Sequence, residues 1–146
     1  MSELAAGSGV KRDDAGIAYR WRGAFADPDL NVLHAEAFEH RMLDDSWIAQ
    51  VDGHSFGWVT AHDGEVLVGF VNVAWDGGVH AFLLDTVVAK SHRRRGIGAG
   101  LVRTAVEHVK GAGLEWLHVD FEPHLRSFYL EACGFTPADA GLIDVS

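Results

Sequence analysis

The sequence has a single cysteine, Cys133, and no long hydrophobic run. One cysteine excludes an internal disulfide. The longest apolar run, residues 66–75, is interrupted by Gly69 and Asn72 and is too short to span a bilayer. The first residues, MSELAAGSGVKRDDAG, lack the apolar core of a signal peptide. We therefore expect a flexible lead-in over residues 1–15, one domain over residues 16–146, and a cytoplasmic location.

The chain is also poor in basic residues. Its 146 residues include 12 Lys and Arg against 21 Asp and Glu, which gives a formal net charge of −9. Such a charge disfavours general binding to the phosphate backbone of nucleic acids and favours a cationic partner, such as an amine. The exception is the segment Lys90 to Arg95, which holds four of the twelve basic residues. Apolar residues at 48% and charged residues at 23% are typical of a globular protein.

Hydrophobic periodicity in the first two thirds of the chain predicts strands around two helices. Asp27-Pro28-Asp29 is a helix-start signal. Asp-Gly pairs at 63–64 and 76–77 predict tight turns, so the three strands around them form an antiparallel meander. The expected elements are a strand at 17–25, helices at 27–38 and 47–51, and strands at 55–61, 65–75 and 79–89.

Beyond the meander, apolar residues recur with helical spacing from Ile97 to Val109. Residues 115–121 alternate and predict a strand, and Pro123 opens a further helix that ends before Gly134. A last strand is expected within residues 135–145. A strand-helix-strand unit thus follows an antiparallel meander, which predicts a mixed sheet.

The stretch HRRRGIGAGL, residues 92–101, stands between a predicted strand and a predicted helix. A helix N-terminus leaves amides unpaired and attracts an anion. Gly96 and Gly98 have no Cβ, so the backbone can approach a phosphate closely. The arginines add donors for phosphate oxygens. The spacing fits neither the Rossmann G-x-G-x-x-G nor a Walker loop. The segment therefore predicts a cradle for a pyrophosphate.

At this point the sequence resembles the GNAT superfamily of acyl-CoA-dependent N-acetyltransferases. The signature Gln/Arg-x-x-Gly-x-Gly/Ala is met by residues 93–98, and an aromatic-Tyr pair followed by Gly-Phe is met by residues 128–135. The resemblance implies a single α/β (α+β) domain. Its mixed, mostly antiparallel sheet would have about six or seven strands flanked by four helices, with the strands at 82–89 and 115–121 splayed apart.

The resemblance also implies acetyl-CoA as co-substrate. The amides of residues 94–98 would hold its pyrophosphate, main-chain groups of Val87 and Val88 would pair with its pantetheine arm, and the Val88 amide would polarise the thioester carbonyl. The complete set of expected cofactor-binding residues is Val87, Val88, Arg93, Arg94, Arg95, Gly96, Ile97, Gly98, Ala99 and Phe128.

Tyr129 matches the family's general acid, which would protonate the departing thiolate. Many members of the family carry Asn seven residues before this tyrosine, where it contacts the pantetheine arm. Here that position is Glu122, followed by Pro123. Because an ionised carboxylate cannot donate a hydrogen bond, Glu122 is expected to face the acceptor instead.

The residue that takes the proton of the amine stays open among four candidates. Asp85 lies in the apolar run LLDTVV, where an unpaired carboxylate is costly and burial can raise its pKa. The alternative for Asp85 is a carboxylate satisfied by neighbouring backbone groups or by a cationic side chain. His118, Asp120 and Glu122 share one face of the strand at 115–121, which is either a cleft wall or an exposed polar face.

These features predict an N-acetyltransferase that moves an acetyl group from acetyl-CoA to a primary amine by direct attack in a ternary complex. The alternative is a non-catalytic acyl-CoA-binding module. The acceptor would be a small amine, an amino sugar, or an amine on a peptide, and exposed sheet edges are compatible with a homodimer. No compact ligand set indicates a metal, no membrane segment is expected, and Cys133 is assigned to core packing.

Overall fold

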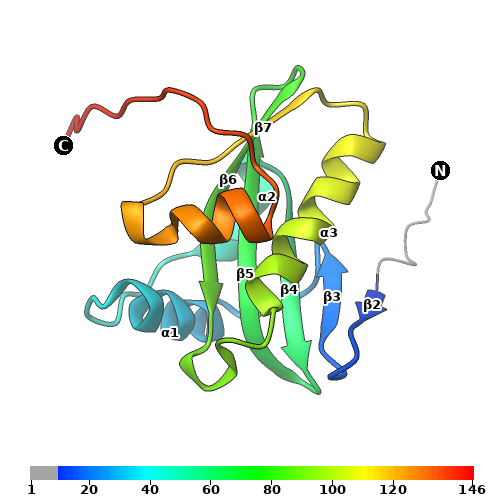
Figure 1. The fold of residues 1–146 in the computed structure, drawn as a ribbon. Coiled ribbons are helices and arrows are strands. Elements are labelled where there is room, and N and C mark those ends of the chain that lie inside the picture. The colour runs from blue at the N-terminus through cyan, green and yellow to red at the C-terminus, as the bar shows by residue number, and fades with distance from the viewer. Residues whose placement is uncertain (1–9) are drawn as a thin grey trace.

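The computed structural model describes residues 10–146 (Figure 1), and within that range six strands form one sheet. The spatial order follows the chain, β2-β3-β4-β5-β6-β7. All neighbours are antiparallel except β6 and β7, which are parallel, so the expected mixed sheet is confirmed. The strands are β2 (Val10–Arg12), β3 (Ala18–Trp21), β4 (Ser55–Asp63), β5 (Val66–Trp75), β6 (His80–Val88) and β7 (Trp116–His118).

Four helices flank the sheet in the described range. They are α1 (Asp27–Phe38), α2 (Trp47–His54), α3 (Ile97–Gly111) and a π-helical segment, η4 (Phe128–Ala132). Two single 3₁₀ turns, η2 (Lys90–His92) and η3 (Pro123–Leu125), precede α3 and η4. None of the helices in this range is long and apolar enough to cross a membrane.

Two apolar clusters lie on opposite faces of the sheet. The larger one packs α3 and η4 against the strands and includes Leu83, Leu101 and Tyr129. The smaller one packs α1 and α2 and includes Leu30 and Trp47. In Figure 1, α3 and η4 lie in front of the sheet. Because helices cover both faces, the central strand β5 is buried on both sides, and its sequence is a nearly continuous apolar run.

The N-terminal part differs in detail from the sequence expectation. Of the lead-in expected over residues 1–15, residues 1–9 lie outside the described part, and Val10–Arg12 form the edge strand β2. The strand expected at 17–25 is shorter, Ala18–Trp21. The Arg22 amide still donates to the Trp58 carbonyl of β4, but the left-handed φ of Arg22, 54°, turns the chain away from the sheet at this residue.

The C-terminal part departs further from expectation. The last strand expected within 135–145 is wrong, since residues 135–146 form neither strand nor helix. Phe135 packs against the larger core cluster, but the apolar residues further on do not: Leu142, Ile143 and Val145 are 81%, 86% and 91% exposed. The helix expected after Pro123 is broken into η3 and η4.

The strands β6 and β7 separate part of the way along. They pair only from His80–Trp116 to Phe82–His118, so the strand expected at 115–121 is regular only over 116–118. Beyond Phe82 the β6 strand bulges, because Asn72 faces Leu84 and Phe70 faces Val87. Two residues of β6 therefore oppose one of β5, which bends the strand. The splay expected from the family resemblance is confirmed at this point.

Candidate active site

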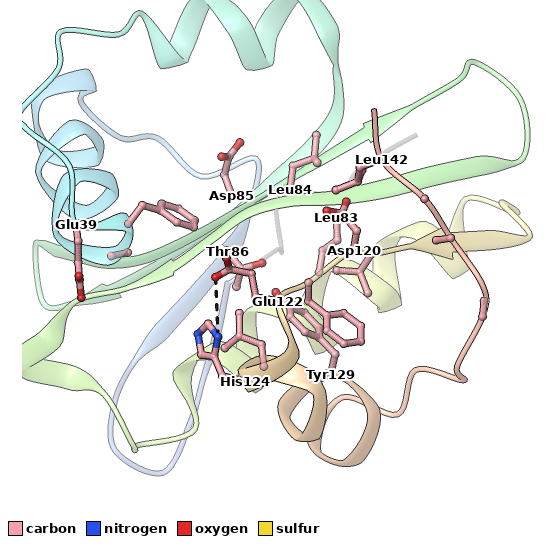
Figure 2. Close-up of a pocket in the computed structure, with 18 residues that line it drawn as sticks. Glu39, Leu83, Leu84, Asp85, Thr86, Asp120, Glu122, His124, Tyr129 and Leu142 are labelled. Atoms are coloured by element: carbon pink, nitrogen blue, oxygen red, sulfur yellow. Dashed lines mark ion pairs between the residues drawn. The ribbon is translucent and has the colours of Figure 1, made fainter. Parts of the chain in front are cut away.

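A cleft of about 1060 Å³ opens where β6 and β7 separate. That volume is close to the upper end of the range for small-molecule sites. One wall is Leu83 to Thr86 of β6, and the other is Val119 to Glu122, which follow β7. Tyr129 of η4, the end of α1 and part of the C-terminal segment complete the lining (Figure 2). The cleft therefore gathers residues from five separate parts of the chain.

Asp85 lies in the bulge of β6 and lines the cleft. Its φ of 57° is left-handed, a conformation that Asp tolerates better than most residues. The side chain is 26% exposed, and its Oδ1 lies 3.2 Å from Nε2 of His34 on α1. This is the satisfied carboxylate that one reading of the sequence expected. It still borders the cleft, so the carboxylate has both a partner and access to a ligand.

Tyr129 lies on the opposite side of the cleft from α1, in the larger core cluster. It is only 6% exposed, and its ring stacks on Phe121 at 5.1 Å. Burial raises the pKa of its hydroxyl above the usual value; the Thr86 side chain opposes this shift, and Cys133 and Asp120 add to it. The hydroxyl therefore stays protonated at neutral pH, as a proton donor must.

The alternation expected after residue 116 holds in the structure. Leu117, Val119 and Phe121 pack against the core, whereas His118, Asp120 and Glu122 are exposed. Asp120 and Glu122 line the cleft, and Figure 2 shows Glu122 beside His124, whose Nδ1 lies 3.9 Å from its carboxylate.

His118 is not brought into the cleft with these carboxylates. Its Nε2 lies 2.7 Å from Nδ1 of His80, and its ring stacks on Phe82. The three residues that share one face in the sequence are thus divided at the point where β6 and β7 part.

The arginine-glycine segment forms the turn into α3. Arg94 and Gly96 both have left-handed φ, 63° and 77°. Within residues 10–146, none of the amides from Arg94 to Ala99 donates to a protein acceptor, whereas the Arg93 amide donates to Lys90 and the Gly100 amide to Gly96. Arg93, Arg94 and Arg95 are exposed and make no ion pair with the described residues. The turn therefore presents unpaired amides and cationic groups, the features of an anion site.

Neighbouring groups hold this turn in place. The Lys90 amide donates to the Glu36 carboxylate at 2.6 Å, and His92 Nε2 lies 2.8 Å from the Asp63 carboxylate in the β4–β5 turn. Ile97, at the start of α3, is buried at 1% exposure. The amides are thus fixed in position without being used by the protein, a preorganisation that benefits the binding of an anion.

A line of contacts joins this turn to the cleft. A Cβ on Gly98 would lie 3.0 Å from the Phe128 ring, so the absence of a side chain lets Phe128 pack on the start of α3. Phe128 in turn meets the Tyr129 ring edge to face at 4.8 Å. Val88 lies next to Gly98, 3.9 Å from that Cβ position. Three of the residues expected to bind the cofactor, Val88, Gly98 and Phe128, therefore lie together, outside the lining of the cleft.

Val87 and Val88 lie just after the bulge of β6. They pair with Phe70 and Gly69 of β5 on one side. On the other side, β7 pairs with β6 only as far as Phe82. The edge of β6 beyond that point is not covered by another described strand.

Several cleft residues were not singled out from the sequence. Thr86 follows Asp85 in the bulge, Glu39 ends α1 with a left-handed φ of 54°, and His124 lies in η3. Asp85 interrupts an apolar run and could be noticed, but Thr86 and Glu39 carry no such signal in the sequence. Burial raises the pKa of the Cys133 thiol to about 11, so it is not a ready nucleophile. No group of three potential metal ligands occurs in residues 10–146.

Comparison with known proteins places this geometry in a family. The model of the acetyltransferase (GNAT) family matches residues 19–135, most of the chain. No curated protein matches the sequence. The family match covers both the turn before α3 and the Tyr129 segment.

Solved structures with the same fold are numerous. A GNAT family acetyltransferase from Streptococcus pneumoniae TIGR4 is 22% identical with a TM-score of 0.69, over 89% of this chain and 98% of that one. A Trypanosoma brucei acetyltransferase is 19% identical with a TM-score of 0.72, over 88% and 99%. An aminoglycoside N-acetyltransferase in complex with CoA is 17% identical with a TM-score of 0.69, over 89% and 94%. At these identities the likeness shows a shared fold.

Proposed function

The chain belongs to the acetyltransferase (GNAT) family, and on that premise we propose that it transfers an acetyl group from acetyl-CoA to a primary amine in a ternary complex. The observation that carries the proposal is the pairing of two features. One is the set of unpaired amides from Arg94 to Ala99, and the other is the cleft that contains Tyr129. The contact of Gly98 with Phe128 joins them.

The residues of the turn fit the pyrophosphate of acetyl-CoA. Amides of Arg94 to Gly98 would donate to its oxygens, and the side chains of Arg93 to Arg95 would pair with its charge. The β6 edge at Val87 and Val88 would pair with the pantetheine arm, much as an added strand does. Bound in this way, the thioester would lie near the cleft. The aminoglycoside N-acetyltransferase with the same fold was solved in complex with CoA, which supports the assignment.

When bound, acetyl-CoA supplies an activated acetyl thioester. The Val88 amide would donate to its carbonyl oxygen, where negative charge develops during attack. Asp85 would take the proton of the amine, since among the four cleft carboxylates it is the one that is partly buried, at 26% exposure, and hydrogen-bonded to a histidine. Tyr129 would give its proton to the sulfur as the carbon–sulfur bond breaks. The raised pKa of Tyr129 keeps that proton in place until it is needed.

The acceptor that this cleft suits carries positive charge. Its lining includes four carboxylates, Glu39, Asp85, Asp120 and Glu122, whereas its basic side chain is His124. Asp120 and Glu122 are exposed at the wall opposite β6 and would hold a second ammonium group while Asp85 serves the reacting amine. A small molecule with two or more amines, such as a polyamine or an amino sugar, would use both sets of carboxylates.

The test is release of free CoA from acetyl-CoA by the purified protein, measured with a thiol reagent across a panel of mono-amines, polyamines and amino sugars. We expect acetyl-CoA to raise the melting temperature and at least one cationic amine to increase thiol release. Protection by acetyl-CoA without amine-dependent release would favour the alternative, a non-catalytic acyl-CoA-binding module. No protection by acetyl-CoA would contradict both.

A further inference from the structure

Behind Asp85, two histidines of one helix end form a continuous hydrogen-bonded chain with it. His34 Nε2 lies 3.2 Å from Asp85 Oδ1, and His34 Nδ1 lies 2.8 Å from His40 Nε2. His40 Nδ1 lies 2.6 Å from the carbonyl oxygen of Arg41. The chain therefore runs from the cleft, through both imidazole rings, to a backbone carbonyl.

The end of α1 brings the two histidines together. Glu39 takes a left-handed φ of 54° at the C-cap, and the His40 amide donates back to the Ala35 carbonyl. This reverses the chain direction, as left-handed C-caps do. His40 then folds back beside His34, six residues earlier. The rings of Phe38 and Trp47 pack on His34 at 4.5 and 5.0 Å and hold it against Asp85.

When all three hydrogen bonds are made, the series Asp85–His34–His40 holds one proton more than two neutral imidazoles and an ionised carboxylate supply. The Arg41 carbonyl only accepts, so His40 Nδ1 carries a hydrogen. Each of the three contacts needs one hydrogen, but two neutral imidazoles bring two and an ionised carboxylate brings none. The third resides on the Asp85 carboxyl or makes one ring an imidazolium. When this third hydrogen is absent, one of the three contacts brings two hydrogen-bond acceptors together.

The geometry also excludes a metal site at this cluster. The two nitrogens of His34 point in opposite directions, one toward Asp85 and the other toward His40. The donor atoms therefore lie in a line and do not converge on a common point, as the ligands of a metal ion would. A linear arrangement of titratable groups suits the movement of a proton.

We infer that Asp85, His34 and His40 form one protonation unit, which accepts a proton from the cleft at Asp85 and holds it on the imidazole rings. This rests on the proposed function, in which Asp85 faces the reacting amine. The amine nitrogen bonds to the acetyl carbon, the carbon–sulfur bond breaks, and the departing sulfur takes the proton of Tyr129. The amine loses its proton to Asp85 Oδ; Asp85 passes a proton to His34 Nε2, and His34 Nδ1 passes one to His40 Nε2. His40 is half-exposed, so the unit exchanges its proton with water there. His34 and His40 act through Asp85 and are positioning residues.

The nearest charged groups in sequence to this unit are Glu39 and Arg41, which flank His40 on either side. Glu39 lines the same cleft. Phe38 and Trp47 are apolar, and they shield His34, which is 18% exposed. Their packing keeps the unit partly desolvated, which strengthens its internal hydrogen bonds.

The experiment reads the ring nitrogens of ¹⁵N-labelled protein by long-range ¹H–¹⁵N NMR at one pH, which reports the protonated nitrogens of each imidazole. His34→Gln and His40→Gln assign the signals. In Asp85→Asn the amide brings its own donor, so both rings should become neutral with hydrogen on Nδ1. Asn also tolerates the left-handed φ. The control His54→Gln removes an exposed histidine at the end of α2 and should leave both rings unchanged.

The total on the two rings decides the matter. The four ring nitrogens of His34 and His40 should carry three hydrogens in the parent and two in Asp85→Asn, and an equal total in the two proteins would overturn the shared unit. A kinetic arm uses His34→Gln, which should lower kcat for amine acetylation at least about tenfold, less than the loss of a direct general base, with the KM for acetyl-CoA unchanged. Full kcat in that variant would also overturn the inference. A joint ring response in a protein that acetylates no amine would reject the proposed function and support the unit.

Discussion

At the scale of single residues, the proposed chemistry needs a hydroxyl that holds its proton until the sulfur departs. Tyr129 meets this need through burial, since its ring is enclosed by Phe121, Phe128 and Phe135 while its hydroxyl reaches the cleft. Burial raises its pKa, because the charged phenolate would lose its hydration there. The same packing that makes Tyr129 a core residue therefore also suits it to donate a proton.

Tyr129→Phe should lower kcat for amine acetylation by about 100-fold, because general acids contribute factors of this order. The affinity for CoA should stay within about twofold, since Tyr129 does not belong to the turn at residues 93–98. Thiol release measures the first quantity and calorimetry the second.

The matched control is Tyr19→Phe, the same change at the only other tyrosine of the chain. Tyr19 packs on Gly100 of α3 and lies outside the cleft, so its variant should keep the parent's kcat. Equal rates for Tyr129→Phe and the parent would remove Tyr129 from the mechanism.

At the scale of elements, the turn into α3 depends on a backbone that Gly96 makes possible. Gly96→Ala should weaken CoA binding about tenfold, because a side chain at a φ of 77° strains the turn that aligns the free amides. Its Cβ meets no protein atom within 4 Å, so the loss would not come from a clash inside the fold.

Gly113→Ala is the control at the other end of the same helix. Gly113 also has a left-handed φ, 84°, and equally open surroundings. Both variants should lose about 1 kcal/mol of stability, but only Gly96→Ala should change the dissociation constant for CoA in calorimetry. Equal CoA affinities in the two variants would show that the turn at Gly96 does not contribute to the binding of CoA.

The elements that could be predicted from the sequence are those whose structure is determined by their own residues. The meander follows from alternating strands and Asp-Gly turns, and α3 from an apolar stripe that the structure buries. The last strand could not be predicted correctly, because Leu142, Ile143 and Val145 are residue types that strands favour but are exposed in the structure. The shortening of β7 depends on the bulge in β6, a feature set by pairing with β5.

The candidate site likewise has a part that the sequence indicates and a part that only tertiary packing creates. Tyr129, Asp85 and the turn at 93–98 stand out in the sequence, because a tyrosine in a motif, a carboxylate in an apolar run and clustered arginines and glycines are local signals. The contacts of Asp85 with His34, and of His34 with His40, join segments through tertiary packing and the left-handed C-cap at Glu39. Neither spacing nor composition could indicate them.

At the scale of the whole molecule, three acidic groups are held neutral by burial, which links stability to alkaline pH. Burial is the largest cause of the pKa shift at each group. It raises the pKa of Cys133 to about 11, and it raises the pKa of Tyr19 to about 12 together with the nearby Asp13 carboxylate. It also raises the pKa of Tyr129. In the unfolded chain these groups ionise near pH 9 to 10. The folded state then binds more protons than the unfolded state.

Stability should therefore be complete below about pH 9 and fall as the pH rises through the raised pKa values. Each group contributes at most about 1.4 kcal/mol per pH unit. The measurement is urea unfolding between pH 8 and 12, followed by fluorescence of the five tryptophans. General repulsion in a chain of net charge −9 also grows in this range, so the parent alone does not isolate the buried groups.

Tyr19→Phe isolates one of them, because it keeps the ring packed against Gly100 and removes the group that ionises. At pH 8 the variant should be less stable by about 1 kcal/mol, since it loses the hydroxyl that lies 3.3 Å from the Asp13 carboxylate. Between pH 10 and 12 the parent alone carries the linkage of Tyr19, so the difference should shrink and then reverse in favour of the variant. A difference that stays constant over that range would show that the Tyr19 hydroxyl titrates alike in the folded and unfolded states, and that its burial does not bear on the alkaline limit of the fold.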